Sequence, residues 1–108
     1  MSDDETIEVD ELDRLRAAGR RVVVVDVRSA EEFAAGHVVG ALHLPEVELA
    51  ARVAEVRGAD LVVTVCGKGG GRSAASMRFL RSVGVRAQLL GGGTLAWLAA
   101  HPADRSEP

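Results

Sequence analysis

The residues best suited to chemistry are a cysteine and two cations within one glycine-rich segment. Cys66 is the single cysteine of the chain and is followed by Gly-Lys-Gly-Gly-Gly-Arg-Ser, so Lys68 and Arg72 stand close to it in sequence. The thiolate is the reactive form of cysteine, and nearby cations favour its formation. We therefore expect Cys66 to be an ionised nucleophile near neutral pH and the catalytic residue of the chain.

The segment after Cys66 also has the composition of an anion-binding loop. Glycines can adopt positive φ and turn successive backbone amides toward one point, and a helix that starts at the end of such a loop adds its unpaired N–H groups. Ser73 is expected to cap that helix, and its hydroxyl can hydrogen-bond the bound anion. The predicted binding residues of the loop are Gly67, Lys68, Gly69, Gly70, Gly71, Arg72 and Ser73.

A simpler explanation is that Cys66 is an inert core residue. Free cysteines are often buried, and they then behave as small apolar side chains. Four glycines follow within five positions, however, and glycine is a poor choice for packing alone because it loses much conformational freedom on folding. Their position between a cysteine and an arginine favours a functional loop.

The elements that must position this loop follow from an alternation of strand-like and helix-like segments. Residues 22–27 and 61–66 are largely apolar and β-branched without polar alternation, which is typical of strands buried on both faces of a parallel sheet. Residues 73–83 carry apolar side chains at helical spacing. The sequence therefore predicts an α/β fold with the loop at the carboxyl ends of the strands, where open sheets usually bind ligands.

Capping and turn residues predict the rest of the architecture. The other predicted elements are a strand at 6–9, a helix capped by Asp10, a short helix from Ser29 to Gly36, a helix at 46–56, a strand at 87–90 and a helix capped by Thr94 that holds Trp97 in the core. The length of 108 residues fits one domain. We expect that domain at 6–101, a disordered N-terminus at 1–5 and a mobile tail at 102–108.

Composition argues against several classes of function. A net charge of −3 with two phenylalanines, one tryptophan and no tyrosine favours neither nucleic-acid binding nor a base-stacking surface. No apolar run is long enough for a membrane span, and the acidic start does not resemble a secretory signal, so we expect a cytoplasmic protein. One cysteine and scattered histidines give no metal-ligand spacing.

Three ordered motifs between about Val22 and His101 resemble the rhodanese-like family. Residues 25–45 read Val-Asp-Val-Arg-Ser-Ala-Glu-Glu-Phe-Ala-Ala-Gly-His-Val-Val-Gly-Ala-Leu-His-Leu-Pro, which is similar to the first signature of that family. The Cys66 loop resembles its active-site loop, and Leu90-Gly-Gly-Gly-Thr-Leu-Ala-Trp97 resembles its closing turn. The resemblance implies a three-layer α/β/α sandwich with a mainly parallel central sheet.

The resemblance also implies sulfur transfer through a persulfide on Cys66. The donor would be a small anion such as thiosulfate, and the acceptor would be cyanide or a thiol, including a protein thiol. No metal or organic cofactor is implied. Arg28 matches the arginine of the family's Asp-x-Arg motif and is a further expected substrate contact, although an ion pair with Glu31 or Glu32 explains it equally well.

The loop departs from the usual family pattern in its length. Sulfurtransferases of the family usually have four residues between cysteine and arginine, whereas five separate Cys66 from Arg72. That spacing resembles the cell-division-cycle dual-specificity phosphatases and related arsenate reductases. Val39 also replaces a frequent proline, which we expect to change only the rigidity of a turn.

Chemistry favours sulfur transfer over phosphate transfer, but the alternatives stay open. A phosphatase needs an acid to protonate the departing alkoxide, and the loop contains no carboxylate. Asp26 stands at the end of a neighbouring strand, where it is better suited to hydrogen-bond backbone amides. His37 is interpreted as a structural residue of a turn. A third hypothesis is a non-enzymatic sulfur carrier or binding module.

Overall fold

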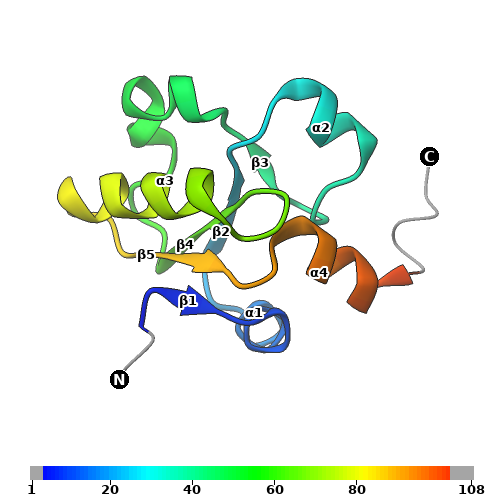
Figure 1. Ribbon diagram of the computed structural model, residues 1–108. Helices are drawn as coiled ribbons and strands as arrows, with labels where there is room; N and C mark the ends of the chain where they lie inside the picture. Colours follow the sequence, from blue (N-terminus) through cyan, green and yellow to red (C-terminus); the bar gives the residue numbers. More distant parts are fainter. Residues whose placement is uncertain (1–3, 103–108) are drawn as a thin grey trace.

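The structure is a computed structural model that describes residues 4–102, and its centre is a five-stranded parallel sheet (Figure 1). The strand order is β1-β5-β4-β2-β3. The strands are β1 (Thr6–Ile7), β2 (Val22–Asp26), β3 (Leu42–His43), β4 (Leu61–Val65) and β5 (Ala87–Leu90). All four pairings are parallel, which confirms the predicted α/β class.

Helical layers cover both faces of this sheet, as expected for strands without polar alternation. The helical elements are α1 (Val9–Ala17), α2 (Ala30–Ala35), the 3₁₀ helices η1 (Glu46–Glu48) and η2 (Ala50–Glu55), α3 (Gly71–Ser82) and α4 (Gly93–Ala100). Within β4, Val62 packs in the core below α3 and η2, while Val63 packs in the core that contains Trp97 of α4. The predicted three-layer sandwich is therefore confirmed.

Helix α2 forms because its first residues cap one another. The Ser29 side chain accepts a hydrogen bond from the Glu32 amide, and the Glu32 side chain accepts one from the Ser29 amide. This reciprocal arrangement is a capping box. Gly36 then ends the helix with a positive φ of 154°, so both predicted ends of this helix are confirmed.

Three predicted N-caps, Asp10, Ser73 and Thr94, are wrong by two or three residues. Helix α1 begins at Val9 after Glu8, so Asp10 lies in its first turn and the preceding strand stops at Ile7. Helices α3 and α4 begin at Gly71 and Gly93, before Ser73 and Thr94, and neither start has a side-chain cap. Val9 packs against the core that contains Trp97, Gly93 lies against the backbone of the Cys66 loop, and Ser73 is buried. These tertiary contacts outweigh the local preference of a capping residue.

The predicted helix at 46–56 is also wrong, because the structure forms η1 and η2 instead. Leu49, Val53 and Val56 are buried at a spacing that imitates an α-helix. Arg52 interrupts the segment with φ −115° and ψ 16°, and β-branched valines lower its helix propensity. Burial of the three apolar side chains therefore fixes the segment without α-helical hydrogen bonding.

The predicted mobile ends lie mostly outside the described residues. Residues 1–3 and 103–108 are not described, whereas the Glu5 carbonyl accepts a hydrogen bond of 2.8 Å from the Leu89 amide. Trp97 is 2% exposed, which confirms its predicted place in the core. Across residues 4–102, no helix has the length and apolar character needed to cross a membrane.

Candidate active site

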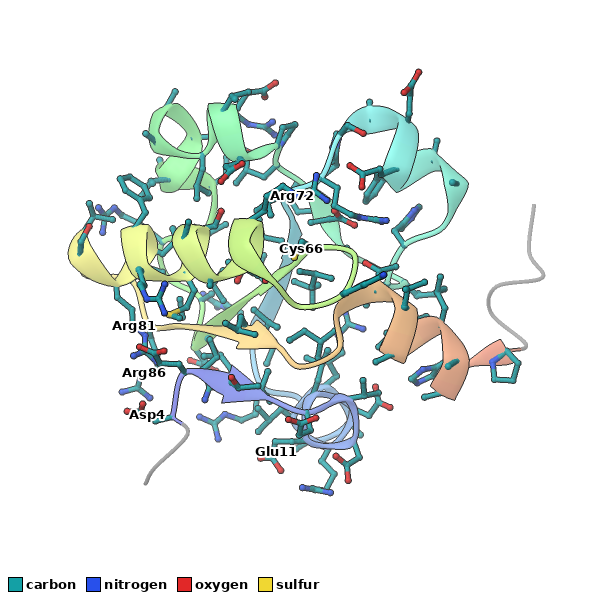
Figure 2. The ribbon with its side chains drawn as sticks, in the orientation of Figure 1. Asp4, Glu11, Cys66, Arg72, Arg81 and Arg86 are labelled. Atoms are coloured by element: carbon teal, nitrogen blue, oxygen red, sulfur yellow. The ribbon has the colours of Figure 1, made fainter. Side chains whose placement is uncertain are left out.

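Cys66 stands where β4 ends and the loop to α3 begins (Figure 2). Every residue of β4 is buried, and the strand is paired on both sides, with β2 and with β5. A strand held in this way fixes the position of the residue that follows it. The predicted placement of Cys66 at the carboxyl end of a central strand is confirmed.

The sulfur of Cys66 lies within a shell of hydrogen-bond donors. The Gly70 amide donates to Sγ over 3.2 Å, and the Ser73 hydroxyl oxygen lies 3.2 Å from Sγ. Burial raises the pKa of the Cys66 thiol, but hydrogen bonds from the Ser73 hydroxyl and from the amides of Ser73, Gly70 and Gly69 lower it, and the net pKa is below the ordinary value. The surroundings therefore favour the thiolate, unlike those of an inert core cysteine.

The Ser73 side chain contacts the Cys66 sulfur and affects its pKa, and Ser73 is not the helix cap that the sequence predicts. It is buried, and its hydroxyl donates to the Gly70 carbonyl over 3.1 Å while the thiol of Cys66 donates to it. When the thiol ionises, the hydroxyl can turn and donate to the sulfur instead. Ser73 therefore stabilises both protonation states of Cys66.

We expect Ser73→Ala to raise the pKa of Cys66, because a hydrogen bond to the charged form is lost. Below that pKa, alkylation by iodoacetamide should slow by about tenfold, since a hydrogen bond to a charged group contributes roughly 1.5 kcal/mol. The pH dependence of the alkylation rate measures this effect. Ser76→Ala is the matched control, because Ser76 is buried on the same helix and its Oγ has no hydrogen-bond partner among the described residues. Equal pH profiles for the two variants would contradict the role of Ser73.

The loop is shaped by close backbone contact with the N-terminus of α4. The Thr94 amide donates to the Cys66 carbonyl over 2.9 Å, and the Leu95 amide donates to the Gly67 carbonyl over 3.1 Å. A Cβ at Gly93 would lie 2.4 Å from the Cys66 carbonyl oxygen, and one at Gly69 would lie 2.8 Å from the Gly92 nitrogen. The glycines at the start of α4 therefore allow the backbone to pack closely against the active loop. The sequence motif alone does not reveal this contact.

Of the four loop glycines, Gly69 alone has a positive φ, of 79°. A Cβ on Gly67, Gly70 or Gly71 would meet nothing within 4 Å. The predicted amide shell therefore forms with a single left-handed residue, and the other three glycines are not required by sterics.

Arg72 points from the first turn of α3 toward α2, where it forms an ion pair with Glu32. Its Nη1 and Nη2 donate to the two carboxylate oxygens over 2.9 and 3.0 Å, and about two-fifths of each side chain is exposed. This bidentate contact holds the pKa of Glu32 down at about 2. Glu32 is a site residue that the sequence analysis missed, although its Ser-x-x-Glu spacing was visible.

Arg28 is bound within the protein, by a partner that the sequence did not suggest. Its Nε and Nη2 donate to Asp26 over 2.9 and 2.8 Å, and Nη2 also donates to the Gly36 carbonyl over 2.7 Å. The alternative prediction, an ion pair of Arg28 with Glu31 or Glu32, is therefore wrong. Asp26 is nearer to Arg28 along the chain and is buried beside it. A role for Arg28 in substrate binding stays a prediction. The backbone hydrogen bond predicted for Asp26 is confirmed, since the Arg28 amide donates to it over 3.1 Å.

We expect Asp26→Ala to lower the free energy of unfolding by about 3–5 kcal/mol, because it leaves the buried Arg28 guanidinium without its counterion. The two side chains are 0% and 8% exposed. Glu48→Ala is the control, since the pair that Glu48 forms with Arg52 is partly exposed and its loss should cost less than about 1 kcal/mol. Urea unfolding measures both. Equal shifts would contradict this account of the buried pair.

Lys68 completes the predicted set. It is exposed in the loop, and its side chain forms no hydrogen bond or ion pair with residues 4–102. His37 lies elsewhere, where its ring stacks on Phe33 at 3.7 Å and its Nδ1 contacts the Phe33 carbonyl over 2.7 Å, which agrees with a structural role. The structure thus places Ser73 against the Cys66 sulfur, with Arg72 close enough for charge interaction with Cys66 and with Lys68 on the same loop.

A cavity of about 500 Å³ lies at the opposite end of the sheet. It is lined by the starts of β2, β4 and β5 together with Asp4, Arg81 and Arg86, which Figure 2 shows far from Cys66. Its lining includes no residue of the Cys66 loop. The surroundings of the reactive sulfur are therefore formed by the loop itself, and this cavity is not part of them.

Comparison with known proteins agrees with this geometry. The family model described as "Rhodanese-like domain" matches residues 8–100. A thiosulfate sulfurtransferase GlpE of Pseudomonas aeruginosa is 33% identical over 110 residues, covering 98% of this chain and 96% of that protein. The crystal structure of a rhodanese-like domain protein from Staphylococcus aureus superposes with a TM-score of 0.78 and 30% identity, covering 86% of this chain and 90% of the other.

A regulatory protein also contains a similar region. The HTH-type transcriptional regulator Rv0324 of Mycobacterium tuberculosis is 41% identical over 100 residues, covering 91% of this chain. The match spans only 44% of that regulator's own length. Since the family model covers most of the chain, and the sheet order and active loop are in place, the chain belongs to the rhodanese-like domain family.

Proposed function

We propose that this domain transfers a sulfane sulfur through a persulfide on Cys66. The thiolate attacks the outer sulfur of a donor such as thiosulfate, the donor's S–S bond breaks, and sulfite leaves with the bonding electrons. A thiol or cyanide then attacks the outer sulfur of the persulfide, which restores the thiolate. No oxidant or cofactor enters this balance.

The observation that carries the proposal is the set of donors around Sγ. The Gly70 amide and the Ser73 hydroxyl lie at 3.2 Å, and further amides of the loop lower the pKa of the thiol despite its burial. The same donors are placed to stabilise a persulfide, which is also an anion on sulfur. The GlpE relatives named thiosulfate sulfurtransferases support this reading. A reactive thiol also suits a reducing compartment such as the cytoplasm.

The contact of Arg72 with Glu32 weighs against the phosphatase alternative. Glu32 is the carboxylate that contacts Arg72 directly, and its pKa of about 2 leaves it unprotonated near neutral pH. A leaving alkoxide needs a proton, whereas sulfite departs without one. The five-residue spacing between Cys66 and Arg72 therefore does not by itself favour phosphate transfer.

The experiment that tests the proposal follows thiocyanate formation from thiosulfate and cyanide by the wild-type protein. Catalysed thiocyanate formation, together with negligible hydrolysis of p-nitrophenyl phosphate, is the expected result. Thiocyanate at the background rate with both thiosulfate and the singly charged methanethiosulfonate would overturn the enzymatic proposal, and rapid ester hydrolysis would replace it with phosphatase activity.

A sulfur-carrier or binding module is the second candidate, and the similarity to a region of a transcriptional regulator favours it. Intact mass spectrometry after treatment with thiosulfate separates the two. A mass increase of one sulfur that disappears on adding cyanide supports the enzyme. A stable increase without turnover supports a carrier, and an unchanged mass supports a binding module.

A further inference from the structure

The cation at the mouth of the active loop is already neutralised by the protein. Arg72 gives both of its terminal nitrogens to the Glu32 carboxylate, at 2.9 and 3.0 Å. An anionic donor that approaches Cys66 therefore meets an ion pair rather than a free guanidinium. The bidentate geometry uses the same face of the arginine that would clamp an oxyanion.

Glu32 is held in this position by more than Arg72. Its Oε1 also accepts hydrogen bonds from the Ser29 amide and hydroxyl, both at 3.1 Å, as part of the capping box of α2. These bonds fix the carboxylate before any donor binds. Since the pKa of Glu32 is about 2, the negative charge persists at every pH at which a folded enzyme would be assayed.

The charges around the Cys66 loop disfavour the approach of a donor that carries several negative charges. Glu46 also lies near enough to Arg72 to raise its pKa, together with Glu32 and the Cys66 thiolate. When Cys66 is ionised, Arg72 therefore lies near three negative charges, and Lys68 on the same loop carries the other positive charge. Repulsion of a donor grows in proportion to the donor's own charge.

We propose that Glu32 is a specificity-determining residue that makes Cys66 discriminate against doubly charged sulfur donors. The preferred class is a sulfane-sulfur donor that carries one negative charge or none, such as a thiosulfonate or an organic persulfide. This inference rests on the proposed sulfur transfer, because its substrate is a sulfur donor. The control of anion access to Cys66 does not depend on sulfur transfer. Glu32 acts through Arg72 and through its own charge.

Two donors of the same chemistry test the proposal. Thiosulfate carries two negative charges, and methanethiosulfonate replaces one of its charged oxygens with a methyl group. With either donor the thiolate attacks the outer sulfur, the S–S bond breaks, and sulfite or methanesulfinate leaves with the electron pair. The leaving groups differ, but this difference cancels when variants are compared, so the change in the kcat/KM ratio between variants reports on charge.

Glu32→Gln removes the charge and keeps the structure. Glutamine also completes a capping box, and its carbonyl oxygen can still accept a hydrogen bond from Arg72. We expect kcat/KM for thiosulfate to rise by about three- to tenfold relative to that for methanethiosulfonate. Glu31→Gln is the matched control, since Glu31 is exposed on the same helix and no hydrogen bond or ion pair of its side chain is found within the described part of the chain. It should leave the ratio unchanged.

Alkylation of Cys66 gives a readout that does not require sulfur transfer. Iodoacetate and iodoacetamide differ by one negative charge, and both consume the thiolate, so the ratio of their rates does not depend on how much thiolate is present. We expect Glu32→Gln to raise the iodoacetate-to-iodoacetamide ratio by about two- to fivefold at low salt, and less at high salt. Glu31→Gln should not raise it.

The outcomes separate the two proposals. If neither donor yields thiocyanate while the alkylation ratio rises in Glu32→Gln, sulfur transfer is refuted and the control of anion access stands. If sulfur transfer occurs but both ratios match those of wild type, the role of Glu32 is overturned. An equal rise in Glu31→Gln would also overturn it, because the effect would then come from general surface charge.

Discussion

Replacing Cys66 with alanine should reduce thiocyanate formation from thiosulfate and cyanide to the uncatalysed rate, a loss of about a thousandfold or more. The chain contains no second cysteine that could take over the sulfur. The surrounding donors would remain, but they stabilise charge on a sulfur atom that the variant lacks. The measurement is the rate of thiocyanate formation under saturating thiosulfate.

Cys66→Ser sharpens the same test. Serine keeps a hydroxyl of similar size among the loop amides, but a hydroxyl is hardly ionised near neutral pH and is a weak nucleophile without an adjacent base. We expect this variant to be as inactive as Cys66→Ala and to bind no sulfur by mass spectrometry. Ser76→Ala serves as an active control. Activity above background in either Cys66 variant would show that the nucleophile lies elsewhere.

Gly93→Ala should lower the free energy of unfolding by about 3 kcal/mol or more and should disrupt the active loop. Its Cβ would lie 2.4 Å from the Cys66 carbonyl oxygen, 2.5 Å from the Gly69 nitrogen and 2.7 Å from the Gly67 carbonyl oxygen. All three are backbone atoms, which have little freedom to move. Gly93 also has φ 61°, a region that costs an alanine about 1–2 kcal/mol. Urea unfolding measures the stability, and iodoacetamide alkylation reports on the loop.

Gly71→Ala is the matched control for this prediction. Its Cβ would meet nothing within 4 Å, its φ is not positive, and it begins α3, where alanine is a better helix former than glycine. We expect its free energy of unfolding to stay within about 1 kcal/mol of wild type. If Gly93→Ala unfolds at the same urea concentration as Gly71→Ala, Gly93 at the start of α4 does not hold the loop.

Glu32 and Gly93 contact the active loop from two different helices, and they lie far apart in the sequence. Glu32 reaches Arg72 from α2, and the turn at Gly93 reaches the backbone of Cys66 and Gly67 from the start of α4. Both contacts act on the position or charge of groups around one sulfur. The chemistry assigned to Cys66 therefore depends on three separate segments of the chain.

Local sequence was sufficient where a residue's role depends on its immediate neighbours. The apolar runs of β2 and β4 determine a parallel sheet with two covered faces, because such strands leave no face for water. The capping box at Ser29 and the stop at Gly36 are short-range features. Cys66 at the end of β4 follows from the same strand. These predictions hold because each pattern behind them, an apolar run or a capping residue, is contained within a few consecutive residues.

Local sequence failed where burial competes with a local preference. Ser73 is a good capping residue, yet it is buried beside the sulfur because α3 starts two residues earlier. The segment 46–56 has helical spacing, yet packing fixes it as two 3₁₀ helices. In both cases the tertiary contact is worth more than the propensity that the sequence displays.

The sequence by itself determined the α/β class, the place of Cys66 and the presence of cations and glycines around it. Only the tertiary structure decided the partners of the arginines: Asp26 holds Arg28, and Glu32 holds Arg72. Glu32 and Arg72 are forty residues apart in number, and the contact exists because β2 and β4 are neighbours whose following segments meet at the same edge of the sheet. Charge in a sequence shows which groups are available, whereas the fold decides which of them remain free for a substrate.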